Sequence, residues 1–172
     1  MEKGSHSWYW QENQGVRWVS SPLFRDSGMT RQGFCGRAGG VSPEPWASLN
    51  ISYLSGDEPS RIGENRRRFA RACGFSLESW RGLRQAHGVR VIRAEENQAG
   101  SAALDPQVVL ERADGQITDA PGLTLVSQHA DCVPLYFLDP VHRAIGLAHA
   151  GWKGTFADMA GAMVEAMRKA YG

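Results

Sequence analysis

Two apolar runs in the second half of the chain constrain its fold most. Val133–Leu138 and Ala144–His149 are separated by a short turn that begins at Asp139 and Pro140, and this pattern predicts a β-hairpin. A helix over about 155–170 is expected to follow, with Thr155 and Asp158 as its cap. Its core-facing residues recur at helical spacing: Met159, Ala162, Met163, Ala166, Met167 and Ala170. With 20 Gly and 6 Trp, the chain fits a mixture of strands and helices better than a helical bundle.

Composition excludes several classes of protein. The 172 residues suggest one domain or slightly more. With 19 Lys and Arg against 18 Asp and Glu, the net charge of +1 predicts neither a nucleic-acid partner nor a membrane surface. No apolar run approaches the roughly 18–20 residues that span a bilayer. Three separated cysteines make no disulfide framework, and the N-terminus lacks a secretory pattern, so a cytoplasmic location is expected.

The first half of the chain shows weaker patterns. Residues 1–30 are expected to be irregular, with a weak alternation at Val16, Trp18 and Ser20 that is typical of an edge strand. A helix is expected from near Ser60 to Cys73, because Gly74 follows as a natural C-cap. Cys35 and Cys73 are interpreted as core residues.

Three residues that can bind metal stand where strands are expected to end or chains to turn. His87 lies in a Gln-Ala-His-Gly corner, Cys132 in an Ala-Asp-Cys loop, and His149 at the end of an apolar run. Two histidines and a cysteine are suitable zinc ligands, and three protein ligands leave a position open for water or substrate. The residues alone also fit a Cys132–His149 nucleophile pair, and isolated His and Cys residues are more often ordinary core positions.

Several sequence blocks, taken together and in order, resemble the YfiH family, also called the laccase-domain, multicopper polyphenol oxidoreductase or peptidoglycan editing factor family. The similarity runs from about residue 30 to the C-terminus. The blocks are Gly36-Arg37-Ala-Gly39-Gly40-Val41-Ser42, Ser48-Leu49-Asn50, Gly56-Asp57, Glu64-Asn65-Arg66, Gln85-Ala-His87-Gly88, Ala113-Asp114-Gly115, Ala130-Asp131-Cys132-Val-Pro134 and Ala148-His149-Ala-Gly151-Trp152-Lys-Gly154.

The resemblance implies an α+β fold of mixed β-sheets flanked by helices, distantly similar to a cysteine hydrolase fold found in a deamidating toxin. It implies a single domain over residues 31–172. The family pattern continues beyond the expected last helix, so the domain is expected to be truncated at its C-terminus. The resemblance further implies a zinc site formed by His87, Cys132 and His149, with copper as the alternative metal.

The activity that the resemblance implies is phosphorolysis of purine nucleosides (adenosine, inosine, guanosine and methylthioadenosine) together with deamination of adenosine. The partners would be purine nucleosides and phosphate. Three alternatives remain open: a Cys–His amide hydrolase that edits peptidoglycan precursors, a copper-dependent polyphenol oxidase, and an inactive truncated domain.

Further residues are assigned to this chemistry. Arg37 is predicted to be a catalytic residue that binds phosphate, because a guanidinium can donate two parallel hydrogen bonds to it. The alternative is that Arg37 packs on Trp46. Asp131 is the candidate acid, or it orients a ligand. Ser42 and Asn50 either contact sugar or phosphate or stabilise turns. Two residues are expected to be neighbours of the ligands: His129, where the family usually has Thr, as a non-ligand, and Trp152 as a buried anchor rather than a stacking platform.

Overall fold

The strands and helices of this chain fall into two units. The structure is a computed structural model that describes residues 8–101, 103–105, 107 and 110–172. Residue contacts divide the chain into one unit of Met1–Phe75 and a second of Ser76–Gly172. Each unit has its own paired strands and its own helices. A single family domain over residues 31–172 stays a prediction.

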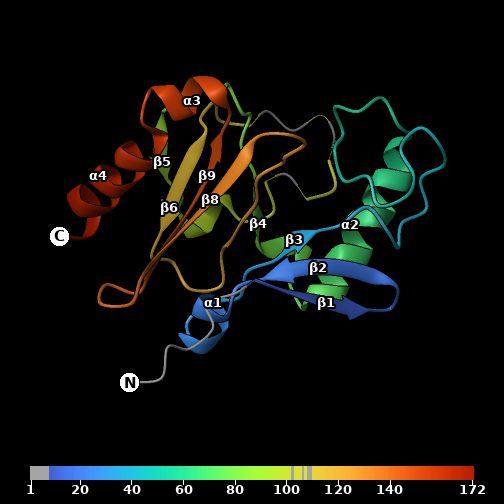
Figure 1. The fold of residues 1–172 in the computed structure, drawn as a ribbon, viewed down its shortest axis with the longest axis horizontal. Coiled ribbons are helices and arrows are strands. Elements are labelled where there is room, and N and C mark those ends of the chain that lie inside the picture. The colour runs from blue at the N-terminus through green and yellow to red at the C-terminus, as the bar shows by residue number, and fades with distance from the viewer. Residues whose placement is uncertain (1–7, 102, 106, 108–109) are drawn as a thin grey trace. The chain divides into compact units, whose positions relative to one another are not determined.

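The first unit contains a three-stranded antiparallel sheet in the order β1-β2-β3 (Figure 1). Its elements are β1 (Tyr9–Asn13), β2 (Val16–Ser20), α1 (Pro22–Asp26), β3 (Phe34–Cys35) and α2 (Pro59–Cys73). Residues 1–7 of the segment expected to be irregular lie outside the described residues, and the rest of that segment holds β1, β2 and α1. The alternation in β2 is real, but β2 is the middle strand of this sheet rather than an edge, which corrects the expectation.

Helix α2 packs against β1 and β2. It buries Ile62 and Phe69, and it ends at Cys73 because Gly74 adopts the left-handed conformation, with φ 72°. The prediction of this helix and of its C-cap is confirmed.

The second unit is organised around a four-stranded mixed sheet in the order β5-β6-β9-β8. The strands are β5 (Val91–Arg93), β6 (Gly115–Thr118), β8 (Val133–Asp139) and β9 (Ala144–Ala150). Strands β8 and β9 form the predicted antiparallel hairpin. A separate parallel pair joins β4 (Trp80–Arg81) to β7 (Thr124–Leu125), and two 3-10 turns lie at Leu77–Ser79 and Glu96–Gln98.

Two helices, rather than one, follow the hairpin: α3 (Trp152–Phe156) and α4 (Met159–Tyr171). The predicted cap over Thr155 and Asp158 is wrong, since Asp158 is itself the N-cap of α4 and accepts the Gly161 N–H at 3.0 Å.

The packing of α4 on the sheet follows the predicted stripe in part. Met159, Met163 and Met167 are buried against the sheet, whereas Ala170 is exposed. The helix lies directly on the sheet because β6 begins with Gly115, where a Cβ atom would stand 2.6 Å from both Met159 Cε and Met163 Sδ.

Strand direction determines where loops meet in this unit. Strands β5 and β6 are parallel, while β9 is antiparallel to both β6 and β8. The starts of β5, β6 and β8 therefore lie at the same end of the sheet as the finish of β9.

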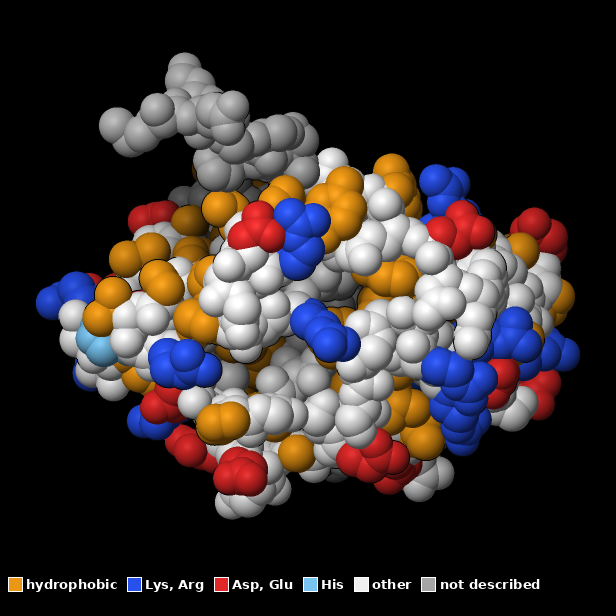
Figure 2. Space-filling model, turned by 90° about the horizontal axis from the view of Figure 1, so that it is seen from below, with side chains coloured by type: hydrophobic (Ala, Val, Ile, Leu, Met, Phe, Trp, Pro, Cys, Tyr) orange, Lys and Arg blue, Asp and Glu red, His pale blue; other side chains and the backbone are white. Residues whose placement is uncertain are grey.

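Two further features concern the helices and the surface charge. No helix among the described residues has the length and apolar character needed to cross a membrane. Basic and acidic side chains both occur, close to one another, on the face drawn in Figure 2.

Candidate metal centre

Three segments at this end of the sheet bring together the three predicted metal ligands. His87 lies in the corner before β5, Cys132 directly precedes β8, and His149 is the penultimate residue of β9. One ligand atom from each residue lies within 4.8 Å of the other two. The rings of His87 and His149 meet edge to face, with centroids 4.7 Å apart. Within the part of the chain that the structure describes, no other group of three His, Cys, Asp or Glu side chains is arranged in this way.

The donor atoms suit a borderline or soft metal ion. Sulfur and imidazole nitrogen bind zinc and copper, whereas magnesium and calcium prefer oxygen. Zinc bonds of about 2.0–2.3 Å place a single ion within reach of donors spaced as these are. His149 is buried, Cys132 is half-buried and His87 is exposed. One side of the cluster therefore faces solvent, as a site with an open coordination position requires.

A buried carboxylate that sequence reasoning did not single out supports this cluster. Asp114, 2% exposed, directly precedes β6. Its carboxylate lies 3.0 Å from His149 Nδ1 and accepts the N–H groups of Ala86, His87 and Gly88 at 2.8–3.1 Å. The motif Ala113-Asp114-Gly115 was visible in the sequence. Its partners were not, because they lie 26–35 residues away along the chain.

Gly151 packs directly against two of the ligands. A Cβ atom at this position would stand 3.1 Å from both Cys132 Sγ and His87 Cδ2. The next residue, Trp152, is 70% exposed, so the prediction of a buried anchor is wrong. Helix α3 begins at Trp152 and directs its ring outward, where Lys153 Nζ lies 5.5 Å from the ring centroid.

His129 lies beside the three-residue cluster but is not part of it. Its Nδ1 atom donates to the backbone carbonyl of Cys132 at 3.1 Å, and its ring centroid is 5.3 Å from that of His149. Burial lowers the pKa of His129 to about 4. The side chain is therefore neutral at physiological pH and braces the backbone of a ligand.

Of the remaining predicted residues, Asp131 is exposed. Among the described residues it has no hydrogen-bond or ion-pair partner. The orienting carboxylate at this end of the sheet is Asp114 rather than Asp131. A role for Asp131 as an acid stays a prediction.

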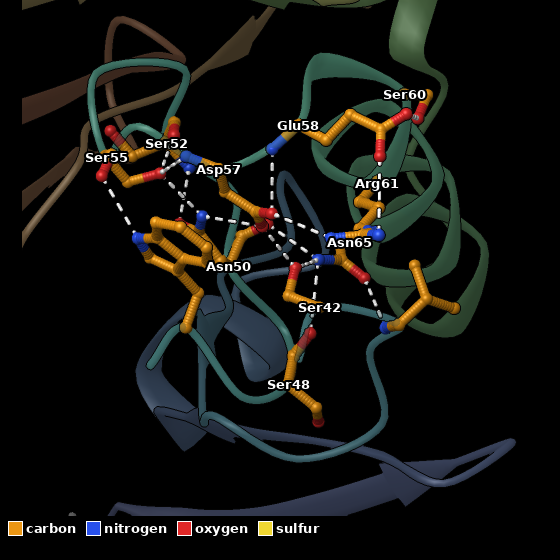
Figure 3. A network of polar contacts seen from close by, with 12 residues as sticks. Ser42, Ser48, Asn50, Ser52, Ser55, Asp57, Glu58, Ser60, Arg61 and Asn65 are labelled. Atoms are coloured by element: carbon orange, nitrogen blue, oxygen red, sulfur yellow. Dashed lines mark hydrogen bonds and ion pairs between the residues drawn. The ribbon is translucent and has the colours of Figure 1, made fainter. Parts of the chain in front are cut away.

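Ser42 and Asn50 belong to a polar network inside the first unit (Figure 3). The buried Ser42 hydroxyl donates to Asp57 Oδ2 at 2.5 Å and accepts from Asn65 Nδ2 at 2.8 Å. Asn50 Nδ2 donates to Ser55 Oγ and to Asp57 Oδ2. Burial raises the pKa of Asp57, but the hydrogen bonds from Ser42, Asn50 and the Glu58 N–H outweigh it and leave that pKa lowered. These are the turn-stabilising contacts that were the alternative to substrate binding.

Arg37 is exposed rather than buried. Its Nε atom donates to the carbonyl of Ala47 at 3.2 Å, and Nη2 lies 3.5 Å from the carbonyl of Pro45. No carboxylate among the described residues pairs with this guanidinium. Two neutral carbonyls hold it in place while its charge remains available to an anion.

A family model described as multi-copper polyphenol oxidoreductase laccase matches residues 31–172. The chain belongs to this family. The family assignment confirms the resemblance drawn from the sequence blocks, and the fold agrees with it. The crystal structure of YlmD from Geobacillus stearothermophilus has a TM-score of 0.84 and 37% identity, with 92% of this chain and 57% of that chain covered. The crystal structure of a Bacillus licheniformis hypothetical protein, YfiH, has a TM-score of 0.82 and 31% identity, covering 92% and 58%.

Curated relatives of this family member carry an enzyme's name. Purine nucleoside phosphorylase YlmD of Geobacillus stearothermophilus is 40% identical over 132 residues, which are 77% of this chain and 48% of that protein. A purine nucleoside phosphorylase of Deinococcus radiodurans is 40% identical over 134 residues, covering 78% and 48%. The chain thus spans about half the length of the curated relatives that it matches.

Proposed function

We propose that this chain is a zinc-dependent purine nucleoside phosphorylase that also deaminates adenosine. The observation that carries the proposal is the cluster of His87, Cys132 and His149, whose three ligand atoms lie within 4.8 Å of one another. The enzymatic names of the relatives supply the substrate class, purine nucleosides and phosphate.

The three metal ligands and the adjacent Asp131 have different roles in the proposed deamination. The side chains of His87, Cys132 and His149 would hold zinc, which in such a site acts as a Lewis acid and makes water a nucleophile at neutral pH. In deamination, Asp131 would donate a proton to the amino group that leaves C6 of the purine. Asp131 is exposed and adjacent to Cys132, so a proton can reach it from solvent.

Phosphorolysis requires phosphate to attack C1′ of the ribose as the glycosidic bond breaks, releasing the base and ribose 1-phosphate. We assign phosphate binding to Arg37, because its guanidinium is exposed and no described carboxylate neutralises it. Ser42 and Asn50 would either contact the sugar or phosphate directly or act indirectly, because their hydrogen bonds stabilise the loop in which they lie.

The test combines metal analysis with product analysis. The purified 172-residue chain is incubated with adenosine, with and without phosphate, beside a Cys132→Ala control. About one zinc per chain, with adenine and ribose 1-phosphate formed only when phosphate is present, supports the phosphorylase. Inosine formation supports the deaminase. The Cys132→Ala protein should lose both the metal and the activity.

Three other outcomes overturn the proposal in distinguishable ways. Zinc without turnover leaves a metal-binding domain that is not this enzyme. Amide hydrolysis by metal-free protein makes Cys132 a nucleophile paired with His149. Bound copper with a blue absorption band and phenol oxidation indicates the oxidase that the family description names.

A further inference from the structure

One buried side chain contacts two of the three metal-binding segments. Asp114 uses Oδ1 to contact both His149 Nδ1, at 3.0 Å, and the His87 backbone N–H, at 2.9 Å. Its other oxygen accepts the Gly88 N–H at 2.8 Å. The backbone carbonyl of Asp114 also accepts the His149 N–H at 2.7 Å. Asp114 is therefore bonded to β9 and to the His87 corner simultaneously.

The first consequence concerns the tautomer of His149. An ionised carboxylate can only accept hydrogen bonds, so His149 Nδ1 carries the proton in its contact with Asp114. The neutral ring then has its lone pair on Nε2. A histidine binds metal through an unprotonated nitrogen, and a hydrogen bond from the opposite nitrogen fixes which one that is.

The second consequence concerns the backbone that carries His87. His87 has a φ of 58°, in the left-handed region that residues other than glycine seldom adopt. Such a conformation is unfavourable and persists only where neighbouring contacts hold it. Three consecutive N–H groups of this corner, from Ala86 to Gly88, donate to the Asp114 carboxylate. Asp114 thereby holds the turn from which the His87 side chain projects.

We propose that Asp114 is a positioning residue that assembles the metal centre, setting the tautomer of His149 and the backbone of His87 before any metal binds. The inference rests on the proposed function for the identity of the metal. The arrangement of the two histidines does not depend on the metal.

The first test substitutes Asp114→Asn and measures zinc affinity by competition with a chromophoric chelator. Losing an orienting partner of a ligand typically weakens metal binding ten- to a hundredfold, and that loss is expected here. The chain offers a matched control in Asp139, which accepts His142 Nδ1 at 2.7 Å and the N–H groups of Val141 and His142 at the opposite end of β8. Asp139→Asn should leave zinc affinity within about twofold of the parent, because it removes a similar contact away from the cluster. Equal zinc affinity in the parent and in folded Asp114→Asn would overturn the proposal.

The second test needs no variant. Nitrogen-15 NMR of the histidine rings in the metal-free parent protein should show a proton on Nδ1 of His149. An unprotonated Nδ1 would overturn the proposal even if Asp114→Asn did not fold. In a folded Asp114→Asn protein whose amide nitrogen faces His149, the amide donates to Nδ1 and the ring proton moves to Nε2. A residue that served only stability would not change the tautomer.

The two proposals fail separately in these experiments. A parent protein that takes up no zinc overturns the proposed function, while the tautomer measured without metal still decides the role of Asp114.

Discussion

The tight packing of Gly151 against the ligands makes Gly151→Ala an informative perturbation of the metal centre. Gly151 has φ −72° and ψ 175° at the N-cap of α3, a backbone that alanine adopts without strain. The substitution therefore adds a methyl group and little else. Its Cβ would stand 3.1 Å from Cys132 Sγ and 3.1 Å from His87 Cδ2, and ordinary contacts begin at 3.4 Å.

The magnitude follows from this overlap. At least one ligand must shift by about three tenths of an ångström, whereas metal–ligand distances tolerate only about 0.2 Å. Overpacking costs about 1–3 kcal/mol. If the metal-bound geometry bears that cost, zinc affinity should fall by about 5- to 150-fold.

The assay is chelator competition with zinc at neutral pH, beside thermal unfolding of the metal-free protein. Gly88→Ala is the matched control, because the nearest atom to its Cβ, Asp114 Oδ2, is 3.7 Å away. Gly88→Ala should bind zinc as the parent does. A folded Gly151→Ala protein with parental zinc affinity would refute the reasoning, and so would an equal loss in Gly88→Ala.

Three further predictions concern stability and thiol chemistry. Met163→Ala leaves a cavity at a fully buried position and should lower the free energy of unfolding, measured by urea denaturation, by about 2–5 kcal/mol. Val164→Ala, at an exposed position, should change it by at most about 0.5 kcal/mol. Equal losses in the two variants would contradict this prediction. Asp57 has a lowered pKa because its hydrogen bonds outweigh burial. The ionised Asp57 therefore stabilises the folded protein above the ordinary Asp pKa, and this contribution is lost as the pH falls through the pKa of the folded state. The difference in Tm between the parent and Asp57→Asn should shrink in acid, and a constant difference would exclude this role. Burial raises the pKa of Cys35 to about 11 and of Cys73 to about 12. Both thiols should therefore be alkylated at pH 8 far more slowly than free cysteine, as followed by mass spectrometry. Rapid labelling would disprove this prediction.

Local patterns in the sequence predict the elements that carry the ligands. The apolar runs around Asp139 identify the β8–β9 hairpin and place His149 near the end of a strand, because both signals lie within a few residues. The break between α3 and α4 was missed. Asp158 adopts a left-handed φ of 59° and caps a new helix that begins at Met159, so the whole apolar stripe lies within α4.

Contacts between distant segments account for what sequence reasoning missed at the candidate site. The Asp114 carboxylate meets the corner at His87 only because β5 and β6 are parallel, and it meets His149 only because β6 pairs with β9. No spacing in the sequence encodes these meetings. The sequence singles out Ser42, but its hydrogen bond to Asp57 forms only when the loops are folded.

The pairing of Pro134 with His149 in the β8–β9 hairpin links the metal centre to strand alignment. Side chains alternate between the two faces of a strand, so a slip by one residue would turn His149 to the opposite face and away from Cys132. An ion that needs both residues binds only the correctly aligned sheet and stabilises it by mass action. Metal uptake would thus discriminate between correctly paired and misaligned chains during folding, acting as a form of proofreading.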